Sequence, residues 1–121
     1  MKTLGIDYGR SKVGLAIADG LLVEPWKVIK VDSFEDAVRK VKSAVTLASA
    51  DRIVVGISEG QMGEESKKFA EELGAETFDE TLTSQDAQRL SIEAGINRKK
   101  RQGMEDAYAA ALMLQNYLDS R

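Results

Sequence analysis

The sequence contains no cysteine and no histidine, and each absence excludes a class of chemistry. Without cysteine there is neither a disulfide nor a thiolate nucleophile. Without either residue type, a Ser-His-Asp or Cys-His nucleophile system cannot form, and a tetrahedral zinc site of the usual ligands is ruled out. Any catalysis must therefore use carboxylates, lysine, tyrosine, hydroxyls, or a hard cation such as Mg²⁺ or Mn²⁺ held by oxygen ligands.

Long apolar runs and an excess of positive charge are also missing. There is no run of about 18 apolar residues and no charged-then-apolar leader, so we expect a cytoplasmic protein that does not enter a membrane. The net charge is −3, so any nucleic-acid binding must depend on local patches. The 121 residues, 43% hydrophobic and 31% charged, suit one compact domain over 1–121.

Apolar periodicity predicts a chain that begins with strands and ends with helices. The strands are expected at 2–8, 13–18, 26–31, 52–57 and 75–78, and the helices at about 33–49, 63–73, from Thr83 or Ser84 to near Gly95, and at about 103–119. Ser33, with Asp36 three residues later, resembles a capping box, and Gly74 is a C′ residue. The order βββαβαβαα predicts an α/β fold whose mixed sheet carries helices on both faces.

An aspartate, Asp7, ends the first strand and is followed at once by a glycine turn. If Leu4 and Ile6 face one side of the sheet, then Gly5 and Asp7 face the other. Glycines around this carboxylate leave space and allow other groups to approach the backbone closely. The alternative is that Asp7 only caps the turn, with Arg10 as its partner.

Two adjacent carboxylates, Asp79 and Glu80, lie just beyond the last predicted strand. Open α/β sheets bind ligands at the carboxyl ends of their parallel strands, where this pair and Asp7 would meet. The residue pattern alone does not separate Asp79 from Glu80. Either of them could instead favour the N-terminus of the following helix through its dipole.

The last predicted helix carries a carboxylate on its packing side. At about 100° per residue, Asp106 lies with Ala110, Met113 and Tyr117, whereas Glu105 lies on the solvent side. Burying an unpaired charge is costly, and a helix N-terminus offsets only up to about 1 kcal/mol of that cost. Several carboxylates in one place also repel each other, which divalent cations would relieve while activating a water for phosphodiester hydrolysis.

Four segments of the chain resemble the YqgF (RuvX) family of the RNase H-like superfamily. They are LGIDYGRSKVGLAIAD (4–19), VVGISEGQMGEES (54–66), FDETLTSQDA (78–87) and GMEDAYAAALMLQNYL (103–118). The resemblance implies an RNase H-like mixed five-stranded sheet, in the order βββαβαβα with helices on both faces. It also implies an endonuclease that depends on Mg²⁺ or Mn²⁺, with Asp7, Glu80 and Asp106 as the metal-binding catalytic residues.

The family resemblance implies two substrates, the 5′ end of precursor 16S ribosomal RNA and, by analogy, the Holliday junction. We favour the RNA, because a junction resolvase normally cuts as a dimer and the sequence shows no dimer surface. We therefore expect a monomer or weak homodimer. A different alternative is a nucleotide-binding domain, since LGIDYG also resembles the phosphate-contacting hairpin of the actin/Hsp70 group.

Several positions depart from the family pattern. The family usually has arginine at Thr81, Gly-Leu-Pro at 56–58, and a lysine before the last aspartate, where this chain has Glu105. These changes spare the metal-binding residues but remove a phosphate-contacting cation, so a non-catalytic RNA-binding or assembly factor is a further alternative. Glu59 is a spare carboxylate where other RNase H-like nucleases often have one, and it ranks below Glu80.

Two groups of cations are candidates for contact with nucleic acid. The run Arg98, Lys99, Lys100 and Arg101 precedes the last helix, and Arg10 and Lys12 lie in the turn after Asp7. Such clusters attract phosphate backbones with a salt-dependent affinity, although the run could also be a solvated loop. Tyr8 and Trp26 could stack on bases, with core packing the stronger interpretation for Trp26.

Overall fold

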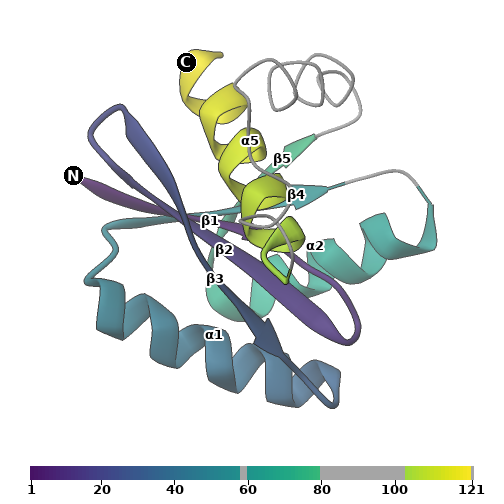
Figure 1. Ribbon diagram of the computed structural model, residues 1–121. Coiled ribbons are helices and arrows are strands. Elements are labelled where there is room, and N and C mark those ends of the chain that lie inside the picture. Colours follow the sequence, from purple (N-terminus) through teal and green to yellow (C-terminus); the bar gives the residue numbers. More distant parts are fainter. Residues whose placement is uncertain (58–59, 80–102, 121) are drawn as a thin grey trace.

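The computed structural model describes residues 1–57, 60–79 and 103–120. Five strands form one sheet in the order β3-β2-β1-β4-β5 (Figure 1). The strands are β1 (Lys2–Asp7), β2 (Lys12–Asp19), β3 (Leu22–Lys30), β4 (Arg52–Ile57) and β5 (Glu76–Asp79), and the helices are α1 (Phe34–Ala48), α2 (Gln61–Leu73) and α5 (Glu105–Asp119). The first three strands are antiparallel, whereas β4 and β5 run parallel to β1. The predicted mixed sheet is therefore confirmed.

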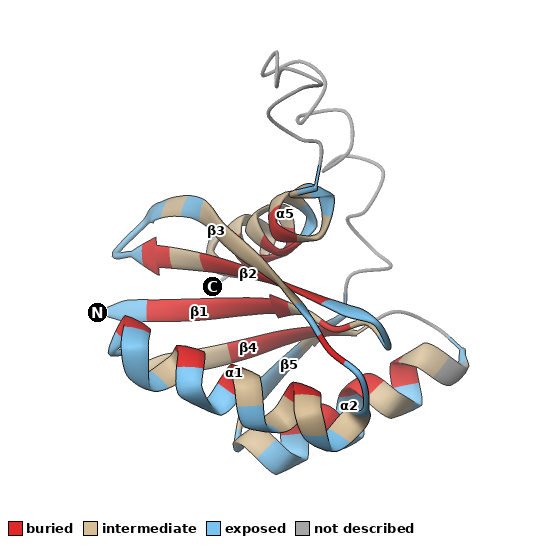
Figure 2. Ribbon diagram, turned by 60° about the horizontal axis from the view of Figure 1, so that its bottom comes forward, coloured by how far each residue is buried: buried red, intermediate tan, exposed pale blue. Residues whose placement is uncertain are grey.

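Helices cover both faces of the sheet, as the sequence predicts: α1 and α2 lie on one face and α5 on the other (Figure 2). The helix expected from Thr83 or Ser84 to near Gly95 lies outside the described residues. None of the helices in the described part of the chain is long and apolar enough to cross a membrane.

The two faces of the sheet differ in the size of their side chains. Alternation along β1 and β2 directs large residues to the α1 and α2 side, where Leu4, Ile6, Val13 and Leu15 are fully buried. The α5 side of the same strands carries Gly5, Gly14, Ala16 and Ala18. Because these residues are small, α5 can approach the sheet closely.

The edge strand β3 begins earlier than the sequence predicts. It starts at Leu22, so the expected start at Trp26 is wrong, and Pro25 lies inside the strand. On an edge strand a proline need not interrupt the ladder, because its missing N–H can face away from the sheet. The register between β2 and β3 also shifts next to Pro25: Leu15 pairs with Lys27 and Ala16 with Pro25, so Trp26 is the extra residue of a bulge.

Local sequence signals set the ends of the helices on the α1 and α2 side. The hydroxyl of Ser33 accepts a hydrogen bond from the Asp36 N–H (3.0 Å) and caps α1, as predicted. The Asp36 carboxylate accepts in turn from the N–H of Asp32 (3.0 Å), and this bond lowers the pKa of Asp36. Gly74 ends α2 in the left-handed region (φ 66), which glycine adopts without strain.

Candidate metal and nucleic-acid site

Three parallel strands end at the same edge of the sheet. β1 ends at Asp7, β4 at Ile57 and β5 at Asp79, and α2 begins shortly after β4. The carboxyl ends of parallel strands in an open α/β sheet are the usual place for a ligand. A metal or phosphate would therefore be expected to bind at this edge, near Asp7.

Asp7 and the first turn of α5 meet at Gly14. Gly14 is the cross-strand partner of Asp7, so their Cα atoms are about 4.5–5.5 Å apart and the two residues face the same side. A Cβ atom built on Gly14 would lie 1.9 Å from the backbone oxygen of Asp106 and 2.1 Å from its carbonyl carbon. The structure thus brings Asp7 and Asp106, almost a hundred positions apart in the chain, to one place on the α5 side.

The packing of α5 determines where Asp106 lies. Its buried residues are Ala107, Ala110, Met113, Leu114 and Tyr117. Leu114 contacts Gly5, where an added Cβ would lie 2.9 Å from the Leu114 Cβ. Glu105 is exposed and Asp106 half-buried, so the helical-wheel prediction that only Asp106 turns toward the packed side is confirmed.

The far end of α5 is held by a polar contact between three elements. The Tyr117 hydroxyl donates a short hydrogen bond to Glu76 of β5 and accepts one from the Nη1 of Arg52 in β4 (3.4 Å). Its ring also meets Phe78 edge-on, with ring centroids 5.8 Å apart. Burial, followed by the contact with Glu76, raises the pKa of Tyr117. These contacts fix α5 along the sheet and, through the helix, the position of Asp106.

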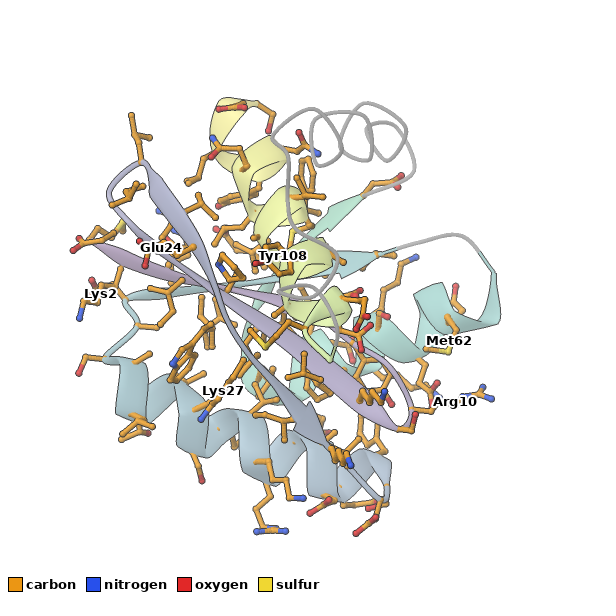
Figure 3. The ribbon with its side chains drawn as sticks, viewed as in Figure 1. Lys2, Arg10, Glu24, Lys27, Met62 and Tyr108 are labelled. Carbon is orange, nitrogen blue, oxygen red and sulfur yellow. The ribbon has the colours of Figure 1, made fainter. Side chains whose placement is uncertain are left out.

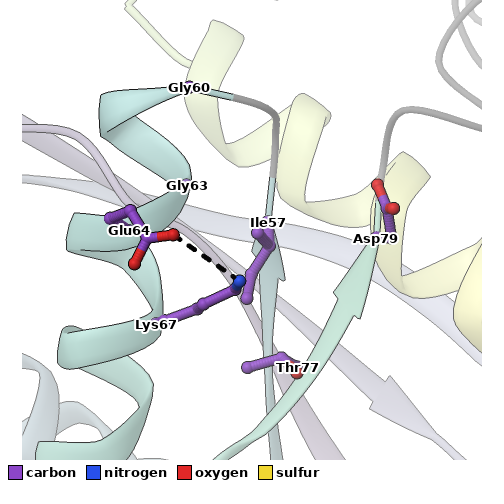
Figure 4. A pocket seen from close by; sticks show the side chains of 7 residues that line it. All are labelled: Ile57, Gly60, Gly63, Glu64, Lys67, Thr77 and Asp79. Carbon is purple, nitrogen blue, oxygen red and sulfur yellow. Dashed lines mark ion pairs between the residues drawn. The ribbon is translucent and has the colours of Figure 1, made fainter.

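Asp79 faces away from Asp7. On β5, Phe78 packs toward α5, so alternation directs Thr77 and Asp79 to the α2 side. There Asp79 lines a pocket of about 320 Å³ at the start of α2, together with Ile57, Gly60, Gly63, Glu64, Lys67 and Thr77 (Figure 4). Lys67 and Glu64 form an ion pair in this pocket, 3.8 Å apart. Asp79 is therefore not part of the surface shared by Asp7 and Asp106.

Other residues expected from the sequence lie outside the described residues. They are Glu59, Glu80, Arg98, Lys99, Lys100 and Arg101. Within residues 1–57, 60–79 and 103–120, no group of three or more acidic side chains is arranged to hold a metal ion. The described carboxylates on the α5 side of this edge are Asp7 and Asp106.

Arg10, expected to contact phosphate, pairs with a carboxylate of α2. Its Nε lies 2.9 Å from Glu65 Oε2, and this contact raises the pKa of Arg10. The Arg10 side chain is still 67% exposed and projects outward at the same end of the molecule as Met62 (Figure 3). Lys12, its neighbour in the turn, is exposed. The sequence analysis missed Glu65, because a pairing across 55 positions leaves no local signal.

The two aromatic candidates for base stacking are packed against the core. The Tyr8 ring is 7% exposed and lies 4.6 Å from Phe69 and 6.3 Å from Phe34, measured between ring centroids. The interpretation of Tyr8 as a base-stacking residue is therefore wrong, because its ring is buried against Phe34 and Phe69 and is not accessible to a base. Burial is also the main cause of its raised pKa. Trp26 is half-buried against the same core, as expected.

A glycine inside β2 is a further residue of the site. Gly14, which was not among the residues expected from the sequence, provides the contact with Asp106. A glycine inside a strand often marks a place where another backbone approaches. Its spacing from Asp7 across the turn would have identified it as the cross-strand partner.

The chain is similar over its whole length to proteins of one family. The model of the RuvX family, described as Holliday junction resolvase, matches residues 1–120. A protein of Endomicrobium trichonymphae named "Putative pre-16S rRNA nuclease" is 36% identical, over 98% of this chain and 95% of that protein. A protein of Geobacillus kaustophilus with the same name is 34% identical, over 100% of this chain and 99% of that protein.

Two solved structures have a similar fold, one of a protein bound to a Holliday junction substrate and one of a viral Holliday junction resolvase. T. thermophilus RuvC in complex with Holliday junction substrate has a TM-score of 0.63 and 16% identity, over 99% of this chain and 96% of that one. The fowlpox virus Holliday junction resolvase has a TM-score of 0.66 and 14% identity, over the full length of both chains. The expected RNase H-like fold is thereby confirmed.

Proposed function

The chain belongs to the RuvX family, and on this basis we propose that it is a divalent-metal-dependent endonuclease acting on structured nucleic acid. The proposal depends above all on one observation: the strand-borne Asp7 and the helix-borne Asp106 meet at Gly14. The backbones of two acidic residues from distant parts of the chain thus come close together, at the sheet edge where open α/β folds bind ligands.

The chemistry of these side chains fits a hard cation. Carboxylate oxygens are the ligands that Mg²⁺ and Mn²⁺ prefer, and Asp7 and Asp106 would hold the ion between strand and helix. When bound, such an ion supplies Lewis-acid chemistry, stabilising charge on the phosphate and making a water more acidic. Asp7, at the end of a paired strand, and Asp106, on a packed helix, provide a rigid arrangement that positions the scissile phosphate.

We propose Glu80 as the third carboxylate. Asp79 lines the α2 pocket on the opposite side of the sheet, which removes it as a partner of Asp7. Glu80 is the next residue in the chain and the one that the family motif indicates. Its role is a proposal that rests on this elimination and on the motif.

The RNA substrate is supported by the names of two relatives of the chain. The proteins of E. trichonymphae and G. kaustophilus are both named for pre-16S rRNA. We therefore propose processing of the 5′ end of precursor 16S rRNA as the reaction. Resolution of Holliday junctions is the second candidate, favoured by the fold shared with a RuvC bound to a Holliday junction substrate and with the fowlpox virus Holliday junction resolvase.

Cleavage and metal binding test the proposal together. Labelled precursor rRNA and four-way DNA junctions are incubated with Mg²⁺ or Mn²⁺ and wild-type protein, Asp7→Asn or Asp106→Asn. We expect each substitution to reduce the cleavage rate by about 100-fold or more, because each removes a group that positions the reacting atoms. Mn²⁺ affinity, measured by calorimetry, should fall in parallel. Asp79→Asn, a carboxylate on the other side of the sheet, is the matched control and should keep both properties.

Other outcomes separate the alternative functions. Equal cleavage by wild type and both variants would refute the assignment of Asp7 and Asp106. Nucleic-acid binding with neither Mn²⁺ binding nor cleavage of either substrate would favour the non-catalytic assembly factor. A requirement for ATP would favour the actin/Hsp70-like alternative.

A further inference from the structure

We propose that Lys30 and Lys12 together bind the phosphates of a nucleic-acid strand that passes over Asp7 and Asp106. Lys12 was a candidate from the sequence, whereas nothing in the sequence pattern pointed to Lys30. The inference rests on the proposed function, and it adds the path by which the substrate reaches the carboxylates.

The two lysines face each other across the antiparallel pair of β2 and β3. Lys12 and Lys30 are cross-strand partners, and both are exposed. Directly opposite side chains have Cβ atoms about 4.5–5.5 Å apart, and like charges at that spacing destabilise the pair. When a protein has such a destabilising pair of like charges with no structural compensation, the pair usually lies at a functional site.

No carboxylate in the described residues neutralises either ammonium group. The ion pairs there involve Arg10, Arg39, Lys40 and Lys67. Lys40 even adds a cation at this end of β3, because its Nζ donates a hydrogen bond to the backbone oxygen of Lys30 (2.8 Å). The charge of Lys40 is offset by Asp36 at 3.1 Å, which leaves Lys12 and Lys30 available to an anion.

The pair lies on the same side of the sheet as the candidate site. The neighbouring partners Val13 and Ile29 pack into the core under α1 and α2, so Lys12 and Lys30 face the α5 side. Lys12 is two residues from Gly14, a separation of about 7 Å along a strand. Since Gly14 touches Asp106 and is paired with Asp7, the two lysines lie together beside these acidic residues.

This placement solves an electrostatic problem of the proposed nuclease. The protein carries a net charge of −3, and its site is built from carboxylates, so a nucleic acid is repelled from both. Two cations side by side next to the carboxylates would hold phosphates of the strand that neighbour the scissile phosphate. Phosphate chemistry is common to RNA and DNA, so the pair supplies affinity and no base specificity.

Another lysine of the same strand provides a matched control. Lys27 is opposite Leu15 and therefore faces the α1 side, where its Nζ lies 4.4 Å from the ring centroid of Trp26 (Figure 3). Lys27→Gln removes the same charge from the same strand as Lys30→Gln, but on the other face of the sheet. A difference in nucleic-acid affinity between the two variants is therefore due to the face of the sheet on which the lysine lies and not to the net charge.

The test measures binding without cleavage. All variants carry Asp7→Asn and are kept in EDTA, and fluorescence anisotropy records their affinity for a labelled single-stranded RNA, the same DNA sequence and a four-way junction. We expect Lys30→Gln to weaken binding about five- to eightfold at about 0.1 M salt. The slope of log affinity against log salt should fall by about 0.7 to 0.9, and Lys12→Gln with Lys30→Gln should double that change. Lys30→Arg should keep the wild-type slope, and Lys27→Gln should change the affinity less than twofold.

Thermal unfolding shows whether Lys30→Gln weakens binding by removing a phosphate contact or by destabilising the fold. Lys30→Gln should be at least as stable as the parent, because it relieves the repulsion from Lys12. If Lys30→Gln and Lys27→Gln bind alike, the inference is wrong, while cleavage that depends on Asp7 would leave the proposed function standing. If the parent binds none of the three nucleic acids, both are wrong.

Discussion

Replacing Gly14 by alanine should displace Asp106 without changing its carboxylate. The new Cβ would lie 1.9 Å from the Asp106 backbone oxygen, whereas ordinary van der Waals contact begins at 3.4 Å. The neighbouring atoms belong to backbone and not to a flexible side chain, so the first turn of α5 must recede by about 1.5 Å to restore that contact.

The expected size of the effect follows from this displacement. Overpacking of this kind typically costs about 1–3 kcal/mol of stability, which a domain of this size should survive. Moving a group that positions reacting atoms by about 1 Å can reduce a rate by about 100-fold. Gly14→Ala should therefore fold, unfold at lower urea concentration than wild type, and lose both Mn²⁺ affinity and cleavage although both carboxylates are intact.

Gly5→Ala is the matched control for this prediction. It makes the same change on the same face of the sheet and against the same helix, but its Cβ meets the side chain of Leu114 at 2.9 Å. Because the nearest atom is the Leu114 Cβ, the helix must shift, but only by about 0.5 Å at Leu114 instead of about 1.5 Å at Asp106. Stability should therefore fall while Mn²⁺ affinity and cleavage largely persist. Wild-type cleavage by Gly14→Ala, or an equal loss of cleavage in both variants, would refute the reasoning.

Three further predictions concern the elements around the site. Leu114 is the α5 side chain that packs on Gly5 and is fully buried, so Leu114→Ala should lower the unfolding free energy by about 2–5 kcal/mol in urea titrations. Burial raises the pKa values of Tyr8 and Tyr117 above 10.0, so their stabilising contribution is complete below about pH 10 and is lost as the pH rises through the folded values. Tyr8→Phe and Tyr117→Phe should therefore lessen the alkaline loss of stability in urea titrations at a series of pH values; unchanged pH dependence would contradict this. Glu65→Gln releases Arg10 from its ion pair and should raise nucleic-acid affinity in anisotropy titrations, whereas Arg10→Gln should lower it; the same shift in both variants would rule out a phosphate contact by Arg10.

Much of the fold could be predicted because its signals are local. The β1, β2, β4 and β5 strands were expected from short apolar runs, and α1 from its 3–4 spacing and its Ser33 cap. The orientation of Asp106 also followed from local geometry, since a helical wheel needs only the positions of the apolar residues around it.

The features that were missed depend on contacts between distant parts of the chain. Whether Pro25 interrupts a strand depends on whether that strand is at the edge of the sheet, and the position of a strand is a property of the whole topology. The burial of Tyr8 likewise depends on Phe34 and Phe69 from two helices. The pairing of Arg10 with Glu65 joins a turn to α2. None of these partners lies within one turn or one strand of the other.

The unequal faces of the sheet account for how a helix and a strand can share one site. Ligands of one Mg²⁺ lie about 2.0–2.1 Å from the ion, so two carboxylate oxygens that share it are within about 4 Å of each other. A helix held away from the sheet by large side chains, as on the α1 and α2 face, would keep its carboxylate too distant from one on β1. On the α5 face the layer beneath the first turn is reduced to Gly14, and the helix backbone rests on the strand itself. The absence of a side chain at Gly14 is therefore as necessary to the proposed metal site as the presence of Asp7 and Asp106.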